Sequence, residues 1–213
     1  MIVPTGAWTP ALLLLAASAC ASGTQGSAAP GPEPHAATAS ARADSVRRSY
    51  TPADVEFMTH MIGHHAQAIE MAQLAPTHGA SASVRTLADR IINAQEDEIA
   101  TMQRWLGARK LPVPEAGSAG TTMSMHGTEH VMLMPGMLTP DQMGELDQAR
   151  GPDFDRLFLT FMIQHHKGAL TMVQQLFGAH GAAQEDTIFK FASDVSADQS
   201  TEVARMQTML ATM

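Results

Sequence analysis

The chain has little positive charge. It contains 13 lysines and arginines against 21 aspartates and glutamates, for a formal charge of −8. Proteins that bind nucleic acid usually present a basic surface to the phosphate backbone. Aromatic residues, which stack on bases, make up only 5% of the chain. We therefore expect no nucleic-acid partner.

Cysteine is almost absent as well, since Cys20 is the only one in 213 residues. It excludes an internal disulfide, and its position indicates another role. The apolar run 11–17 is too short to span a bilayer, and the small residues of 17–19 precede Cys20, as at a signal-peptide cleavage site. This resembles a bacterial lipobox, whose cysteine is lipidated. An ordinary secretory signal with an incidental cysteine is the alternative.

Either interpretation makes residues 1–20 a signal peptide and the protein an exported one. We favour a membrane-anchored lipoprotein, attached through lipidated Cys20 and facing the periplasm or the cell exterior. Residues 21–50 are rich in Ala, Ser, Gly and Pro, with almost nothing to bury. This composition predicts a flexible tether.

What the chain does contain is a repeat. Residues 57–72 recur as residues 158–173, 101 positions later, and both copies carry Phe-x-x-x-Met-Ile-x-His-His-x-x-Ala-x-x-Met. At about 100° per residue, the shared residues fall on one helical face. A buried face normally carries Leu, Ile and Val, but this one carries imidazoles and thioethers. His60 joins it in the first copy, and Phe161 replaces His60 in the second.

Each His-His helix is followed by a helix with the pattern Gln-x-x-Glu-x-x-x-Met, at Gln95 and again at Gln199. Thr51-Pro52-Ala53-Asp54 predicts a capped helix start, and no segment shows the alternation of a strand. We expect helices over about 51–75, 81–106, 152–177 and 183–211. They form hairpins at about 51–106 and 152–212. The prediction for residues 51–213 is an all-α, ferritin-like four-helix bundle with the His-His faces inside.

The long connection, about residues 107–151, concentrates soft metal ligands. They are Met123, Met125, His126, His130, Met132, Met134 and Met137. Connections of this length are usually functional or disordered, and the two interpretations are equally open here. Apart from a short capped helix at Thr139, we expect no regular structure until something binds. Such sites would be weaker than sites on helices, suited to capturing metal and passing it inward.

Histidine, methionine and glutamate on facing helices suggest a metal site. Thioethers suit Cu(I) and imidazole suits copper and zinc. We therefore expect copper as Cu(I), with Ag(I) as a mimic and zinc as a possibility. The main candidate ligands are His60, Met61, His64, His65, Met71, Glu98, Met102, Met162, His165, His166, Met172, Glu202 and Met206.

Other chemistries fit less well. A ferritin-type di-iron site needs Glu-x-x-His and a zincin needs His-Glu-x-x-His, and the chain has neither. A structural interpretation stays open: Glu98 and Glu202 could accept hydrogen bonds from the paired histidines in a buried polar network. Methionines at helical spacing are often core residues, and we expect that of Met58, Met143 and Met209.

Both copies of the repeat resemble the bacterial family catalogued as "domain of unknown function 305". The runs 134–140 and 154–158 share the resemblance, which covers roughly residues 50–213. It implies a ferritin-like helical bundle in an exported protein, associated in some members with copper binding and resistance. It also implies a metal-binding core of Met61, His64, His65, Met162, His165 and His166. Phe161 in place of His60 implies an asymmetric site.

Together these patterns predict a non-catalytic envelope protein that sequesters or hands on Cu(I). Its partners would be the metal ion, the membrane and an envelope copper-handling protein. A ferritin-like metalloenzyme doing redox chemistry, such as cuprous oxidation, is one alternative. A metal-free structural or interaction bundle is another.

Overall fold

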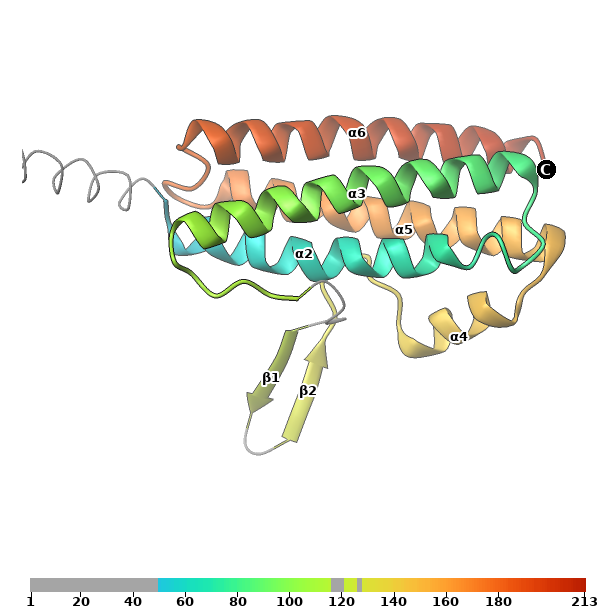
Figure 1. The fold of residues 1–213 in the computed structure, drawn as a ribbon, viewed down its shortest axis with the longest axis horizontal. Helices are drawn as coiled ribbons and strands as arrows, with labels where there is room; N and C mark the ends of the chain where they lie inside the picture. The colour runs from blue at the N-terminus through green and yellow to red at the C-terminus, as the bar shows by residue number, and fades with distance from the viewer. Residues whose placement is uncertain (1–49, 116–120, 126–127) are drawn as a thin grey trace, which may run out of the picture.

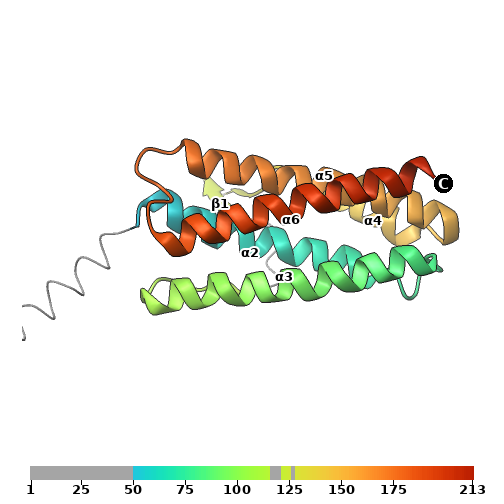
Figure 2. The same ribbon diagram turned by 90° about the horizontal axis from the view of Figure 1, so that it is seen from above.

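The computed structural model describes residues 50–115, 121–125 and 128–213, with the backbone alone for 121–125 and 128–132. The four long helices of the described residues lie side by side (Figures 1 and 2). α2 packs against α3, α5 packs against α6, and α2 contacts α5 across the two pairs. The helical architecture predicted from the sequence is confirmed. The elements are α2 (Pro52–Gln73), α3 (Ala82–Ala108), β1 (Thr121–Met125), β2 (Thr128–Met132), α4 (Pro140–Gln148), α5 (Gly151–Gly178) and α6 (Asp186–Ala211).

The helix starts follow their capping residues. Thr51 and Thr139 each form the predicted capping box, with proline in the first turn of the helix that follows. Ser81 caps α3 through its side chain, which accepts from the Val84 N–H. The predicted start of α6 at residue 183 is wrong. Ala183 lies in the preceding turn with φ of 54°, and α6 begins at Asp186.

Two aspartates tie each helix pair to the turn of the other. Asp54 at the start of α2 accepts a hydrogen bond from the Ala183 N–H, in the α5–α6 turn, at 2.7 Å. Asp155 at the start of α5 accepts two from the Ser81 N–H, before α3, both at 3.1 Å. Both carboxylates are buried. Asp54 and Asp155 occupy equivalent positions in the two copies, so the sequence repeat is matched by a repeated contact between the two helix pairs.

The connection was expected to have no regular structure apart from the helix at Thr139, and this expectation is wrong for residues 121–125 and 128–132. β1 and β2 form an antiparallel hairpin within the connection, with Met123 opposite His130 and Thr121 opposite Met132. It extends from the side of the bundle (Figure 1). The sequence carried a signal other than hydrophobic alternation. The run 121–132 is rich in threonine, which favours strands, and the two residues between its halves end in glycine, a common hairpin pattern.

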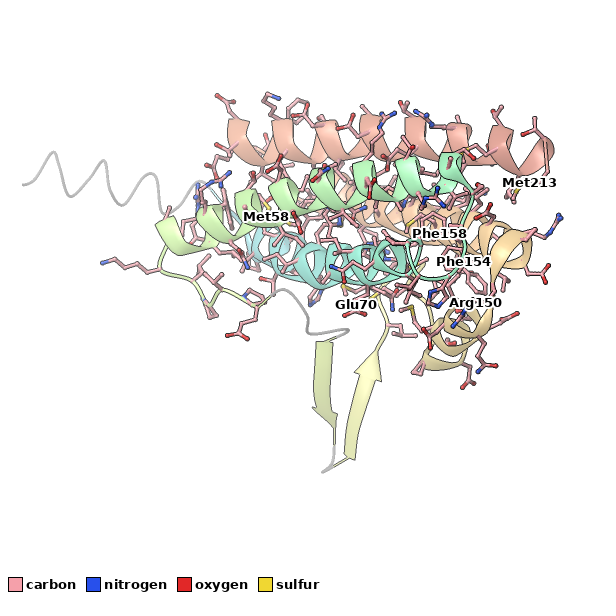
Figure 3. The ribbon with its side chains drawn as sticks, turned by 45° about the vertical axis from the view of Figure 1, so that its right-hand side comes forward. Met58, Glu70, Arg150, Phe154, Phe158 and Met213 are labelled. Carbon is pink, nitrogen blue, oxygen red and sulfur yellow. The ribbon has the colours of Figure 1, made fainter. Side chains whose placement is uncertain are left out.

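The apolar interior consists of two clusters at opposite ends of the bundle. Met58 and Met61 of α2 pack with Met172 and Leu176 of α5 in one cluster. Met71 and Ala72 of α2 pack with Phe154, Phe158 and Met162 of α5 in the other. Met58 and the Phe154–Phe158 pair lie well apart in the interior (Figure 3). On both helices, the paired histidines fall between these two clusters.

None of the helices in the described part of the chain is long and apolar enough to cross a membrane. The predicted signal peptide, Cys20 and the predicted tether up to residue 49 lie outside the described residues.

Candidate metal centre

Four histidines form a polar layer across the middle of the bundle. His64 and His65 come from α2, and His165 and His166 come from α5. All four side chains are fully buried. We call these four residues the histidine layer. An apolar cluster lies on either side of it, so the layer is enclosed along the bundle axis.

The two outer histidines of the layer are held by glutamates. The Nε2–H of His65 donates to Glu98 Oε2 of α3 at 2.5 Å, and the Nε2–H of His166 donates to Glu202 Oε2 of α6 at 2.6 Å. The hydrogen bonding that the structural interpretation expected therefore holds for His65 and His166, but His64 and His165 do not bond these glutamates. Both glutamate side chains keep a little exposure, 17% and 18%. They close the layer toward solvent.

The two inner histidines meet face to face. The ring centroids of His64 and His165 lie 3.9 Å apart, with 38° between the ring planes. His64 Nε2–H donates to the carbonyl oxygen of Pro135 at 2.9 Å. Neither nitrogen of His165 has a hydrogen-bond partner among the described residues. The inner pair is therefore asymmetric although the repeat is not.

Burial keeps both inner rings neutral. Burial first and the nearby His65 second lower the pKa of His64 to about 3, against the opposing effect of the Pro135 carbonyl. Burial also lowers the pKa of His165 well below its ordinary value, with the nearby His64 ring as the next cause and the His64 backbone as the one opposing effect. A neutral imidazole offers one nitrogen lone pair to a metal ion.

The layer contains many buried polar atoms that lack partners. Within the described part of the chain, no partner exists for the Nδ1 atoms of His64, His65 and His166. The same holds for Gln95, at both side-chain polar atoms, and for Gln199 Oε1. Each buried polar atom left unpaired costs roughly 1–3 kcal/mol. A cluster of them at one level of a bundle is typical of a site that binds something.

Gln95 and Gln199 were not among the predicted site residues. They are buried one turn before Glu98 and Glu202 on their helices. Their signal was present in the sequence, since the repeated pattern begins with glutamine. Pro135 was also missed. It bonds His64 through its backbone carbonyl, which every residue type has, so the sequence gives no signal for it.

The helical methionines predicted as ligands flank the layer inside the apolar clusters. Met61, Met102 and Met172 belong to the cluster around Met58, and Met71, Met162 and Met206 to the cluster around Phe158. All six are buried. Met58 is also buried, as expected of a core residue, and Met143 and Met209 pack against the core while half-buried.

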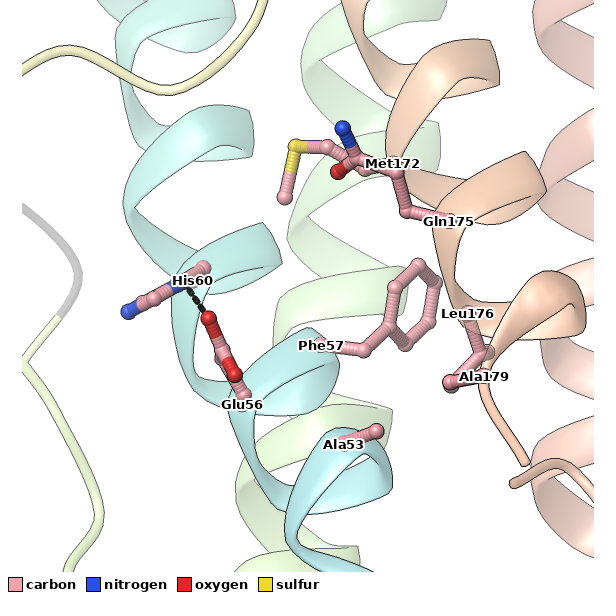
Figure 4. A pocket seen from close by; sticks show the side chains of 8 residues that line it. All are labelled: Ala53, Glu56, Phe57, His60, Met172, Gln175, Leu176 and Ala179. Carbon is pink, nitrogen blue, oxygen red and sulfur yellow. Dashed lines mark ion pairs between the residues drawn. The ribbon is translucent and has the colours of Figure 1, made fainter. Parts of the chain in front are cut away.

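His60 does not join the histidine layer. Its side chain keeps 24% exposure, and its Nδ1 lies 3.8 Å from Glu56 Oε1. It borders a pocket of about 210 Å³ together with Phe57 and Met172. Its ring is turned away from Met172, which reaches toward α2 from α5 (Figure 4). His60 therefore lies at the edge of the buried face of α2. Phe161, which takes its place in the second copy, is buried.

The ligands predicted on the connection separate into two groups. Met134 and Met137 are buried and pack in the cluster around Met58. They lie outside the helices and strands, as expected, but their side chains are held by packing in the core. Met123, Met125, His130 and Met132 lie on the β hairpin, where only the backbone is described. His126 lies outside the described residues.

The donor set fits a soft metal ion, though not in its present arrangement. Among the described residues, no three His, Cys, Asp or Glu side chains are grouped so as to hold one. A bound ion would need imidazoles to turn or thioethers to complete its ligands. Histidine ligands usually donate their second ring N–H to a carboxylate or carbonyl. His64, His65 and His166 already have such partners.

The repeated His-His pattern and its paired helices agree with a known sequence family. The profile described as "Domain of unknown function (DUF305)" matches residues 54–210. The chain belongs to this family. No curated protein sequence matches it.

Solved structures of DUF305 proteins share this fold. A fragment from Deinococcus radiodurans is 27% identical, with a TM-score of 0.64, over 77% of this chain and 99% of the fragment. A Streptomyces coelicolor protein, inferred to be secreted, is 25% identical, with a TM-score of 0.62, over 75% of this chain and 92% of its own.

The chain is also similar to CopM, which has been solved with metal bound. The Cu(I)-bound form is 28% identical, with a TM-score of 0.57, over 75% of this chain and 96% of CopM. Cu(II)-bound and silver-bound forms of CopM match at 29% and 27% identity.

Proposed function

We propose that this chain is an exported copper-binding protein that sequesters or transfers Cu(I) in the cell envelope, and so serves copper tolerance or homeostasis. The histidine layer carries the proposal. It gathers four buried imidazoles, each with at least one ring nitrogen that has no partner among the described residues. The similarity to CopM, which binds Cu(I), Cu(II) and silver, supports the same class of ion.

Imidazole nitrogens of the layer would hold the ion, with help from the thioethers of Met61 and Met162. These two methionines precede the histidine pairs by one turn on each helix. Thioether and imidazole together suit Cu(I), with Ag(I) as its mimic, while zinc would use the imidazoles alone. Glu98 and Glu202 orient His65 and His166 in this proposal instead of binding the metal themselves.

We favour binding over catalysis because the layer is enclosed. All four imidazoles are fully buried, which suits retention of an ion better than turnover of a substrate. The arrangement of four long helices with inward ligands is of the ferritin-like type in this proposal. The β hairpin, with His126, would supply weaker sites that capture metal and pass it inward.

Export and anchoring belong to the same proposal. The related Streptomyces protein is inferred to be secreted, and Cys20 follows a signal-like segment. We propose that Cys20 is lipidated, that residues 21–50 act as the tether, and that an envelope copper-handling protein exchanges metal with the bundle. A Cys20→Ser form should leave the membrane fraction. Its retention there would contradict the anchor.

Metal analysis and titration test the function. Purified protein is analysed for metals, then titrated with Cu(I), Cu(II) and Zn(II) against chelators of known affinity. We expect tight Cu(I) binding that is lost when His64, His65, His165 and His166 are all replaced by leucine. The exposed His180 gives a matched control, because His180→Leu should keep the tight site. Absence of tight copper binding in the unmodified protein would remove the proposal.

A metal-free structural layer is the second candidate. The bonds of His65 and His166 to their glutamates favour it, since these are complete without metal. The unpartnered nitrogens count against it. If the histidine replacements stabilise the bundle while copper binding is absent throughout, this candidate is the correct one.

A further inference from the structure

The segment Met134–Leu138, which we call the strap, crosses the bundle beside the histidine layer. It is fastened to two helices. Gln67 of α2 bonds both backbone groups of Leu138, accepting from its N–H at 2.7 Å and donating to its carbonyl at 3.0 Å. Gln164 of α5 donates to the Gly136 carbonyl at 3.3 Å. The strap therefore has a fixed position relative to both His-His helices.

Two glycines let the strap approach α5 at backbone contact. A Cβ on Gly168 of α5 would overlap the Pro135 carbonyl group. A Cβ on Gly136 would lie 2.6 Å from the Gln164 carbonyl oxygen, and Gly136 has φ of 77°, a conformation that favours glycine. Backbone cannot yield to such an overlap as a flexible side chain can. The strap keeps this path only with glycine at both positions.

The path brings the Pro135 carbonyl to His64. A carbonyl oxygen only accepts hydrogen bonds, so the His64 nitrogen 2.9 Å away must carry the proton. In a neutral ring that leaves the lone pair on Nδ1, which has no partner among the described residues. His165, the counterpart in the repeat, has no such bond to any residue that the structure describes. The chain has one strap for two inner histidines.

We propose that Gly136 and Gly168 are positioning residues, which set the tautomer of His64 through the Pro135 carbonyl and so present Nδ1 to a bound ion. His165 stays free to offer either nitrogen and adapts to the ion that His64 receives. Only the role of the ion rests on the proposed function. The tautomer is a property of the metal-free chain.

Long-range ¹H–¹⁵N correlation spectra of the metal-free full chain test the tautomer directly. We expect His64 in the Nε2–H form. Gly168→Ala should displace the strap and shift the His64 signals toward a mixture of tautomers. Gly178→Ala is the matched control, because it lies on the same helix with no atom within 4 Å of an added Cβ. An Nδ1–H form in the unmodified chain overturns the proposal, as does an unchanged His64 in folded Gly168→Ala.

A second variant covers the case in which Gly168→Ala does not fold. Gln67→Leu releases the strap at Leu138, and its His64 signals are judged in the same way. Cu(I) competition then separates the two proposals. We expect Gly168→Ala to weaken copper binding by about 10- to 100-fold, and Gly178→Ala to leave it unchanged. If His64 shows the expected tautomer but no form binds copper, the positioning role stands and the proposed function fails.

Discussion

The two His-His helices have matching sequences at their centres but different surroundings. In α2 and α5 alike, the second histidine of the pair bonds a glutamate on the next helix, at 2.5 and 2.6 Å. The first histidines differ, since His64 bonds Pro135 and His165 bonds nothing described. The duplicated helices thus build a symmetric frame, and the single connection breaks the symmetry inside it. Contacts within the repeat occur in both halves, whereas the strap, although it touches both helices, bonds the inner histidine of only one.

The largest expected effect is one that both halves share, a loss of stability in acid. The folded chain holds the pKa of His64 at about 3 against 6.5 when unfolded, and lowers that of His165 in the same direction. Below pH 6.5 the unfolded chain gains protons that the folded chain does not. The free energy of unfolding of the metal-free protein should fall by about 1.4 kcal/mol per pH unit for each histidine.

Urea unfolding at several pH values between about 6.5 and 5 measures this slope, above the range in which most carboxylates titrate. His64→Leu and His165→Leu should each reduce it, and by similar amounts. A slope that neither substitution changes would show that the inner histidines are accessible to protons in the folded state.

The next effect concerns the strap, which contacts both halves but bonds an inner histidine of only one. Met134 and Met137 are 9% and 4% exposed within the core. Replacing either with alanine should cost roughly 2–5 kcal/mol, as expected for large-to-small changes in a core. Met143→Ala, at a half-buried position, should cost less. Denaturant midpoints compare the three variants, and equal midpoints would mean that the strap is not packed.

The inner histidines themselves should respond differently to the same substitution. His165→Leu removes two buried nitrogens that have no partner in the described part of the chain, which should stabilise the metal-free bundle by roughly 1–3 kcal/mol. His64→Leu removes one such nitrogen but also leaves the Pro135 carbonyl unpaired. Its gain should be smaller or absent. Thermal unfolding of both variants measures the two gains in stability. A larger gain for His64→Leu than for His165→Leu would contradict the assignment of the stabilising bond to His64.

The smallest effect should be the most symmetric. Glu98→Gln and Glu202→Gln keep an acceptor for each histidine but remove the charge, at a cost of about 1 kcal/mol. The two costs should agree, because the exposures of 17% and 18% and the bond lengths agree. A clear difference between them would show that the asymmetry of the inner pair extends to the outer pair.

Local patterns predicted the helical part of this molecule well. Thr51 and Thr139 cap helices as their sequences indicate, and the Gln-x-x-Glu spacing brings Glu98 to His65. The bond is predictable because both partners recur at helical spacing on helices joined by a short turn. The proposed metal ligands themselves stay predictions.

The connection was harder to predict, because its structure depends on contacts distant in sequence. Met134 and Met137 are buried since Gly136 can approach Gly168, and nothing near either glycine in the sequence indicates that contact. The Pro135 carbonyl reaches His64 for the same reason. His60 keeps 24% exposure for a different reason. Regular angular spacing along one helix does not indicate how far around that helix its neighbour packs.

Asp54 and Asp155 have a consequence for how the chain unfolds. Each buried carboxylate belongs to one helical hairpin and holds the turn of the other, through the N–H groups of Ala183 and Ser81. If one hairpin unfolded alone, the buried aspartate of the hairpin that stays folded would lose the N–H group that it bonds in the other. The two repeats therefore act as one cooperative unit, and the metal-free bundle should melt in a single transition instead of half by half.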